Sequence, residues 1–379
     1  MALFVLAGAC LGAASGVFET TFNNYLNDTF HLTAAQRGGL EFPRELPGFL
    51  TAVLSGALFF LVETRMAALC ALGVAAGMIG IATHGDAWTT MLISTIVWSA
   101  GTHLLMPLQG GIGLSLAEKG KEATLLGRLG AVSTAATIIG CGFVWLAIDR
   151  WHLGYSRIFI GGAVAAVLAA IILAAMRVPS TKTKRKPFVV RREYRLYYAL
   201  CVLFGARKQV FITFGPWVLI RCFGQKPDVF AKLWIVSALI GVLLRPALGR
   251  WIDHYGERKI LMTDAAMMIL VCLGYGFAER LGLGANAVRL VYLCYIMDQV
   301  LFGTGMARTT YVDKIAAKRE DVSPTLSLGV SLDHAVSMSI PVLGGLVWMR
   351  YGYSYVFLGA ACIALLNGFA ASRMRSPHR

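Results

Sequence analysis

Long runs of apolar residues, separated by short polar stretches, dominate the pattern along this chain. A helix that crosses a bilayer needs roughly 20 mostly apolar residues. Runs of this length predict twelve membrane-spanning helices, at about 3–27, 39–62, 66–84, 88–116, 125–148, 156–176, 196–220, 229–249, 259–278, 287–312, 325–348 and 354–372. No basic segment precedes the first run and no cleavage site follows it, so we expect it to be a retained helix rather than a signal peptide.

The longest polar stretch, Arg177 to Arg195, is strongly basic and has Glu193 as its single acid. It divides the predicted helices into two sets of six. We therefore expect an all-α membrane protein with twelve transmembrane helices in two pseudo-symmetric six-helix bundles. The bundles occupy 1–176 and 196–379, and a basic cytoplasmic linker at 177–195 joins them.

Composition supports a membrane protein over a soluble one. Only 15% of the residues are charged, against about 25% in soluble domains. The net charge of +15 does not indicate nucleic-acid binding, because the basic residues lie between apolar runs and not on one polar face.

Basic residues also predict the topology. Lysine and arginine are more frequent in the loops on the linker's side than in the opposite loops, where we place Arg37. The positive-inside rule then puts both termini in the cytoplasm. We expect a multi-pass, monomeric protein of the plasma (inner) membrane.

The eight cysteines form no close pair of the C-x-x-C kind and lie mostly within apolar runs. They read as small buried hydrophobic residues, so neither a disulfide framework nor a metal site is expected. No phosphate-binding loop, nucleophile elbow or dinucleotide fingerprint stands at a convincing position. We therefore expect no cofactor, no enzymatic activity and no transport driven by ATP through this chain alone.

Two short segments suggest an internal repeat. Gly16–Phe22 in the first predicted helix aligns with Gly205–Phe211 in the seventh, with glycine and phenylalanine matched and Glu19 opposite Lys208. Repeated halves are typical of secondary transporters, whose substrate sites lie between the repeats. A pair between Glu19 and Lys208 across a central cavity is one hypothesis from this alignment.

The loop after the eighth predicted helix carries a motif. Gly249 to Lys259 reads G-R-W-I-D-H-Y-G-E-R-K, which resembles the G-x-x-x-D-x-x-G-x-[RK]-[RK] signature of the major facilitator superfamily. The six-plus-six layout and basic central loop extend the resemblance over nearly the whole chain. In that family such loops are cytoplasmic and latch the bundles in one state. The resemblance implies helix packing at Gly249, capping and ion pairing by Asp253, and basic partners at Arg258 and Lys259.

The chain departs from the family pattern in two places. The first-half copy of the loop motif should follow the second helix, where only Glu63–Arg65 stands, without the glycines. The fifth helix carries Thr137–Gly142 where drug–proton antiporters of the superfamily have a proline motif, and a Pro341–Gly345 run appears in the eleventh helix instead. These departures lower the expectation of a gating role for the first loop and of a drug antiporter.

Polar side chains within the predicted helices are the candidate site, because a charge in hydrocarbon is costly and tends to face an interior cavity. We expect substrate binding or ion coupling from Glu19, Asn23, Arg44, Glu45, His103, Gln109, Lys208, Gln209, Trp217, Asp298, Gln299, Arg308, Asp333 and His334.

In the first half, Glu19 and Asn23 lie one turn apart on one helix face. A partly desolvated carboxylate exchanges protons near neutral pH, so Glu19 is a coupling candidate; a structural ion pair is the alternative. Arg44 and Glu45 bind solute, hold the outer gate closed, or form a structural charge cluster at the membrane interface. His103 can change charge near neutral pH, or it is a hydrogen-bonded packing residue.

In the second half, Lys208 suits an anionic or hydroxylated substrate, and Trp217 is the best candidate for stacking on one. Asp298, Asp333 and His334 are candidates for proton relay. Because Asp333 and His334 are adjacent, they point to different faces, and we expect only one to line a cavity. Arg308 either joins the site or holds the loop near Asp313 and Lys314.

Together these residues favour a secondary active transporter, a proton symporter that moves a small polar or anionic solute by alternating access. Its partners are that small molecule, protons and the lipid bilayer. Two alternatives stay open: a multidrug/proton antiporter, and a membrane receptor with a transporter-like fold that carries no flux.

Overall fold

The computed structural model describes residues 1–51, 63–116, 122–176, 190–316, 318 and 321–374. Every regular element in these ranges is a helix, as expected. The chain divides into two compact units, which are described separately. Most of the predicted linker, 177–189, and the end of the second predicted span, 52–62, lie outside the described residues.

The first unit comprises Met1–His31, Pro47–Thr183 and Gln225–Ile235. Its helices are α1 (Ala2–Phe30), α4 (Glu63–His84), α5 (Trp88–Leu116), α6 (Glu122–Asp149) and α7 (Tyr155–Ala175). α4 packs against α5 and α7, and α1 packs against α6 and α7.

Small residues set the close approach of these helices. A Cβ at Gly16 of α1 would overlap the carbonyl oxygen of Thr137 in α6, and a Cβ at Gly140 would overlap that of Ala13. Close backbone contact through glycine is the usual way that helices associate where lipid offers no hydrophobic driving force.

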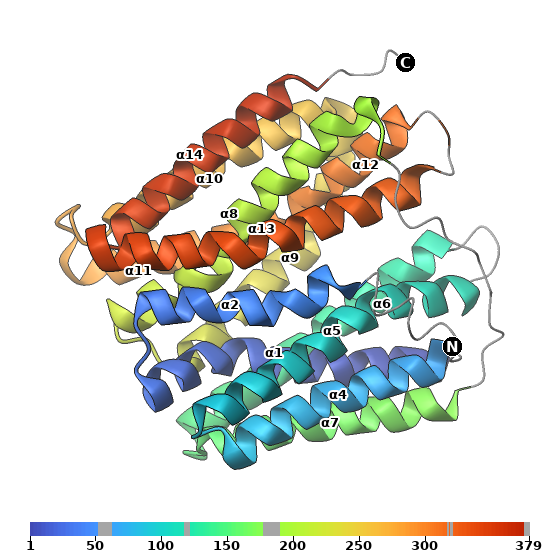
Figure 1. The fold of residues 1–379 in the computed structure, drawn as a ribbon, viewed down its shortest axis with the longest axis vertical. Coiled ribbons are helices and arrows are strands. Elements are labelled where there is room, and N and C mark those ends of the chain that lie inside the picture. The colour runs from blue at the N-terminus through green and yellow to red at the C-terminus, as the bar shows by residue number, and fades with distance from the viewer. Residues whose placement is uncertain (52–62, 117–121, 177–189, 317, 319–320, 375–379) are drawn as a thin grey trace. The chain divides into compact units, whose positions relative to one another are not determined.

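The second unit comprises Leu32–Leu46, Lys184–Gly224 and Val236–Arg379. It contains most of α2 (Ala34–Phe49), then α8 (Arg195–Arg221), α10 (Glu257–Phe277), α11 (Ala287–Leu301), α12 (Met306–Ile315), α13 (Val322–Tyr351) and α14 (Tyr353–Ser372). α9 (Pro227–Tyr255) begins in the first unit and continues in the second. α8 packs against α13 and α14, and α10 packs along α14 (Figure 1).

The tenth predicted span, 287–312, is one segment in three parts. α11 is followed by a 3₁₀ turn, Phe302–Gly305, and then by α12. Gly303 and Gly305 lie in this turn, where glycine weakens the regular helix. The turn brings Thr304 and Arg308 into the polar interior described below.

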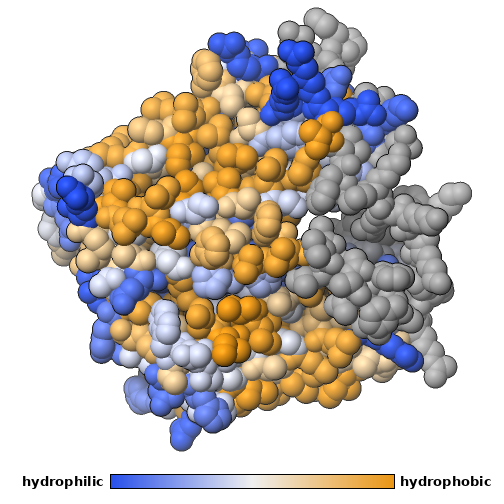
Figure 2. Space-filling view, in the orientation of Figure 1, coloured by the Kyte–Doolittle hydropathy of each residue, from blue (hydrophilic) through white to orange (hydrophobic). Residues whose placement is uncertain are grey.

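Ten helical segments in the described part are long and apolar enough to cross a membrane. Large apolar side chains on them face outward; Leu243 is 78% exposed and Ile139 is 70% exposed. Figure 2 shows apolar side chains along the helices and polar ones gathered toward the helix ends. A soluble surface does not expose this much apolar area, so the chain is a multi-pass membrane protein.

Two of the twelve predicted spans, α2 and α8, are not among these ten. The described part of α2 is 16 residues long, with as much polar as apolar character. α8 has 27 residues, but Arg207, Lys208 and Gln209 interrupt its apolar run. Polar residues in the middle of a helix lower its mean hydropathy, so such a helix is not recognised as a membrane span by hydropathy alone.

Candidate functional site

An ion pair between α8 and α13 lies at the centre of the second unit's polar residues. Lys208 Nζ is 2.7 Å from Asp333 Oδ1, and the two side chains are 10% and 20% exposed. Ser337 Oγ, one turn along α13, donates to the same oxygen over 3.3 Å. A Cβ at Gly205 would overlap the Asp333 carboxylate, so the glycine lets the acid approach α8.

A cavity of about 240 Å³ adjoins this pair. Asp333 lines it, together with Tyr197, Phe204 and Arg308. The guanidinium carbon of Arg308 lies 3.4 Å from the centre of the Phe204 ring, a cation–π contact. Arg308 therefore belongs to the cavity wall.

A second buried pair joins α8 to α10. Arg207 Nη1 is 2.6 Å from Asp264 Oδ2, with both side chains 2% exposed. Thr304 Oγ1 donates to the other oxygen of Asp264 over 3.0 Å. Asp298, on α11, is buried in the electrostatic field of this pair, and Gln299 Nε2 lies 3.4 Å from its Oδ2.

The first half of α2 carries a charge network, of which Arg44 was predicted from the sequence as a site residue and Arg37 and Glu41 were not. Arg37 and Glu41 are both fully buried. The Glu41 carboxylate accepts hydrogen bonds from Arg37 at 2.5 Å, from Arg44 at 3.0 Å, and from Gln209 of α8 at 2.7 Å. The placement of Arg37 in an outside loop was wrong, because α2 begins at Ala34, before the apolar run.

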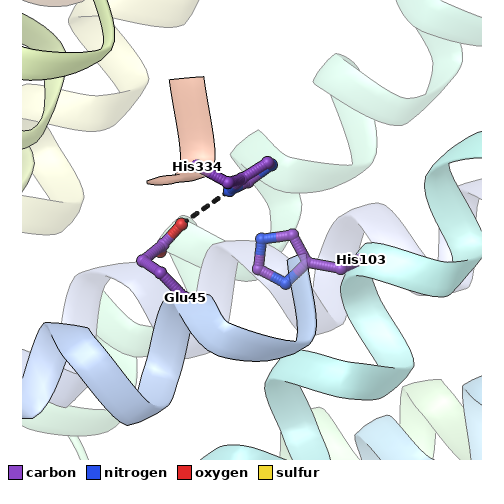
Figure 3. Close-up of side chains that lie close together, drawn as sticks. All are labelled: Glu45, His103 and His334. Carbon is purple, nitrogen blue, oxygen red and sulfur yellow. Dashed lines mark hydrogen bonds and ion pairs between the residues drawn. The ribbon is translucent and has the colours of Figure 1, made fainter. Parts of the chain in front are cut away.

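Glu45 continues this network one turn further along α2. Its Oε2 lies 2.9 Å from Nδ1 of His334 on α13, as Figure 3 shows. Asp333 and His334 thus contact different helices, α8 and α2, and of the two only Asp333 lines the cavity.

The candidates of the first unit lie on α1 and α5. Glu19 and Asn23 are half-buried on α1, and Gln109 is half-buried on α5. His103 Nδ1 lies 2.9 Å from the backbone oxygen of Ser99, one turn earlier. The expected pairing of Glu19 with Lys208 stays a prediction, because the two residues belong to different units.

Trp217 is 1% exposed and packs in the core of the second unit. Its ring therefore has no open face for a substrate in this conformation. Asn24, by contrast, was not singled out from the sequence; it is buried, and its Nδ2 donates to the backbone oxygen of Gln225 at 2.8 Å.

The loop motif lies at the junction of α9 and α10. Gly256 has φ +81° and separates the two helices. A Cβ at Gly249 would meet no atom within 4 Å, and Asp253, Arg258 and Lys259 are exposed. The packing and latching roles of these four residues stay predictions.

The ion pair at this end is Glu257 with Lys314, at 2.7 Å. It joins the first turn of α10 to the last turn of α12. One alternative was that Arg308 holds the segment at Asp313 and Lys314; in the structure the partner of Lys314 is Glu257.

The arrangement as a whole is a set of charged side chains inside spanning helices, most of them paired, beside a small cavity. Pairing is what makes a charge tolerable at membrane depth. Such a set suits the binding of a polar solute and the movement of protons, and it contains no nucleophile placed against a base for covalent chemistry among the described contacts.

Solved structures of other proteins share this fold. A crystal structure of a mutant of the nucleoside transporter NupG superposes with a TM-score of 0.80 at 15% identity, covering 99% of each chain. A crystal structure of a D-xylose-proton symporter gives 0.76 at 13% identity, covering 99% of this chain and 97% of the other. These likenesses show the fold alone.

A curated relative, "Probable vesicular acetylcholine transporter-A" of Danio rerio, is 25% identical over 150 residues. The match covers 38% of this chain and 27% of the relative, so the chain spans about a quarter of that protein's length. The family model described as Major Facilitator Superfamily matches residues 4–323, which is most of the sequence. The chain therefore belongs to the major facilitator superfamily.

Proposed function

We propose that this protein is a secondary active transporter that moves a small polar or anionic solute across a membrane by alternating access, coupled to protons. Members of the superfamily are membrane transporters, and the D-xylose-proton symporter with the same fold carries its coupling ion in its name. Twelve spans in two six-helix bundles follow if α2 and α8 cross the membrane together with the ten apolar segments.

The observation that carries the proposal is the Lys208–Asp333 pair at the edge of the cavity that Arg308 lines. Two cations and one anion here leave an excess of positive charge. A purely structural pair needs no adjoining cavity, whereas a solute site needs both polar groups and space. A polar or anionic solute fits this charge better than a greasy cation does.

Proton coupling is supported by the carboxylates of the same interior. Glu45 with His334, Asp298 beside the Arg207–Asp264 pair, and Asp333 at the cavity are each placed to gain or lose a proton when their partner moves. Glu19 in the first unit is a further candidate. A monomer in the plasma (inner) membrane with both termini cytoplasmic is the topology that we propose with this mechanism.

Uptake by purified protein in sealed liposomes tests the proposal. Vesicles are offered a mixture of isotope-labelled polar metabolites under an inward proton gradient, and the lumen is analysed by mass spectrometry. We expect one or a few solutes to accumulate, and a protonophore to abolish this. Absence of any accumulation above protein-free vesicles would refute transport, and accumulation that ignores the gradient would refute proton coupling.

Matched variants tie the flux to the site. A charge-assisted hydrogen bond is worth ~1.5–3 kcal/mol, so Lys208→Ala and Asp333→Asn should each lower uptake by about tenfold or more. Lys232→Ala is the control, because Lys232 is 45% exposed, pairs with Asp228 and does not line the cavity. Equal losses in all three variants would contradict a specific role for the pair.

A multidrug/proton antiporter is the second candidate. The name of the Danio rerio relative names acetylcholine, and the aromatic rings of Tyr197 and Phe204 in the cavity wall suit a cation. Efflux of an apolar cation should survive Lys208→Ala and fail in Asp333→Asn. A receptor without flux is distinguished by binding in the absence of any transport.

A further inference from the structure

Among the residues that the structure describes, no carboxylate lies within ion-pair distance of Arg308. It lies in the segment Gly284–Ile315, one of the candidate spans, and its side chain is half-buried. Its close contact is the stack on Phe204, and Asp333 and Asp264 act on it only through longer-range electrostatics. A cation at membrane depth usually pairs with an anion or faces a water-filled cavity, so the cavity in front of Arg308 is where a partner would bind.

The neighbouring acids are already engaged. Asp333 holds Lys208 at 2.7 Å, and Asp264 holds Arg207 at 2.6 Å. Asp298 lies beside the latter pair and does not line the cavity. The cavity therefore keeps the charge of Arg308, while the charges of Lys208 and Asp333 cancel.

The orientation of the guanidinium leaves its donors available. Stacking on a ring uses the flat face of the group and leaves the in-plane N–H groups free for a planar, two-oxygen partner. The backbone makes room for this arrangement. A Cβ at Gly305 would lie 3.2 Å from Arg308 Nη2, so any larger residue at position 305 would press on the guanidinium.

The rest of the wall defines the space in front of Arg308. The cavity holds about 240 Å³, the volume of roughly eight water molecules at ~30 Å³ each. A Cβ at Gly329 would collide with the hydroxyl of Tyr197, which places that hydroxyl close to the opposite wall. The space is large enough for a carboxylate of a few carbon atoms.

We infer that this cavity binds a small carboxylate anion. Arg308 holds the two carboxylate oxygens through its in-plane N–H groups, Phe204 supports the guanidinium from its face, and Tyr197 offers a hydroxyl to the remaining polar end. This inference rests on the proposed function, because it names the substrate class of the same transporter.

Binding is tested on the purified full chain in detergent with named probes: acetate, lactate and succinate against the neutral amides acetamide and lactamide. Calorimetry and thermal shift should register at least one carboxylate and neither amide. Arg308→Gln should abolish the signal, and Arg308→Lys should weaken binding by about tenfold or more, because lysine keeps the charge and loses the two-pronged geometry.

Arg289→Gln is the control for net charge, since Arg289 is on the preceding helix, α11, and contacts Asn286. It should bind carboxylate as the unchanged protein does. Binding of the amides as strongly as the acids, or undiminished carboxylate binding by Arg308→Gln, would overturn the inference. Inorganic phosphate and sulfate are run in parallel, and a preference for either one over every carboxylate would also overturn it.

The two proposals fail in different ways. Metabolite uptake by liposomes without any carboxylate binding would overturn the carboxylate site and leave transport standing. Carboxylate binding that depends on Arg308, in a protein that moves no solute, would refute transport and leave the site standing.

Discussion

The Arg207–Asp264 pair provides a sharp test of how buried charges hold the second unit together. Asp264→Asn keeps the shape of the side chain and removes its charge, which leaves Arg207 buried without an ionised partner. Both side chains are 2% exposed, and Thr304 also donates to the same carboxylate. Breaking a buried pair from one side costs ~3–5 kcal/mol, so we expect a loss of free energy of unfolding in that range.

Asp228→Asn is the matched control. The Lys232–Asp228 pair has a similar N–O distance, 2.9 Å, but the lysine is 45% exposed. Exposed pairs are worth at most about 1 kcal/mol, so the same substitution should cost little there. Unfolding is followed by circular dichroism as sodium dodecyl sulfate is titrated into mixed micelles.

A double variant separates the cost of the orphaned charge from the worth of the pair. Arg207→Gln with Asp264→Asn leaves no unpaired charge, so it should be more stable than Asp264→Asn alone. Equal losses for Asp264→Asn and Asp228→Asn would refute the reasoning, because burial would then not decide the cost. A double variant less stable than both singles would refute it as well.

Three further outcomes follow from particular contacts. Gly38→Ala should lower the free energy of unfolding by ~1–3 kcal/mol, because its Cβ would overlap the Pro341 carbonyl. A Cβ at Gly39 meets no atom within 4 Å, so Gly39→Ala should leave the free energy of unfolding unchanged or raise it by up to about 1 kcal/mol. Thermal unfolding of the two variants measures the difference. Burial raises the pKa of Cys222, just after α8, to about 12. In a chain with Cys222 as its only cysteine, the rate of maleimide labelling should therefore be low at neutral pH and keep rising beyond pH 9. A rate that levels off near pH 9 would contradict this. Arg308→Gln should change the free energy of unfolding by no more than about 1 kcal/mol, the scale of one cation–π contact, and a loss as large as that of Asp264→Asn would show a hidden partner.

The apolar pattern of the sequence predicted the helices closely. The spans expected at 88–116 and 354–372 correspond to Trp88–Leu116 and Tyr353–Ser372. A spanning helix must be apolar along most of its length, so its bounds are visible in one dimension. The interruption at Phe302–Gly305 was not predicted, because it depends on tertiary contacts at Thr304 as well as on glycine.

The start of α2 shows why part of the site could not be predicted. Ala34 to Glu45 is polar enough to resemble a loop, and Arg37 was placed in one. In the structure Glu41 is buried because Arg37, Arg44 and Gln209 donate to it. Hydropathy assigns a cost to each charge singly and does not register that a partner on another helix removes the cost. The alternation of Arg and Glu at a spacing of three to four residues is the one signal that was present.

Partner choice was the other limit. Lys208 was singled out correctly as a charge inside a helix, and the structure gives it Asp333 as a partner, 125 residues further along the chain. The repeat alignment suggested Glu19, a pairing that stays a prediction, since a pseudo-symmetric position is the only relation that the sequence itself supplies. Which acid reaches a lysine depends on helix rotation and on small residues such as Gly205, whose missing side chain admits Asp333.

The paired and unpaired charges of the second unit have different physical meanings. A pair such as Arg207–Asp264 satisfies itself, so losing one member should cost stability first and any activity as a consequence. Arg308 has a ring beneath it and a cavity in front of it, so removing its charge relieves a desolvation cost in the empty state and should cost activity alone. A functional site can keep a residue that lowers the stability of the fold, because the ligand interacts with that residue when it binds. Both arginines lie over the ring of Phe204. A loss of stability on removing the Arg207 charge and a loss of activity alone on removing the Arg308 charge would therefore distinguish a charge that stabilises the fold from one that binds the solute.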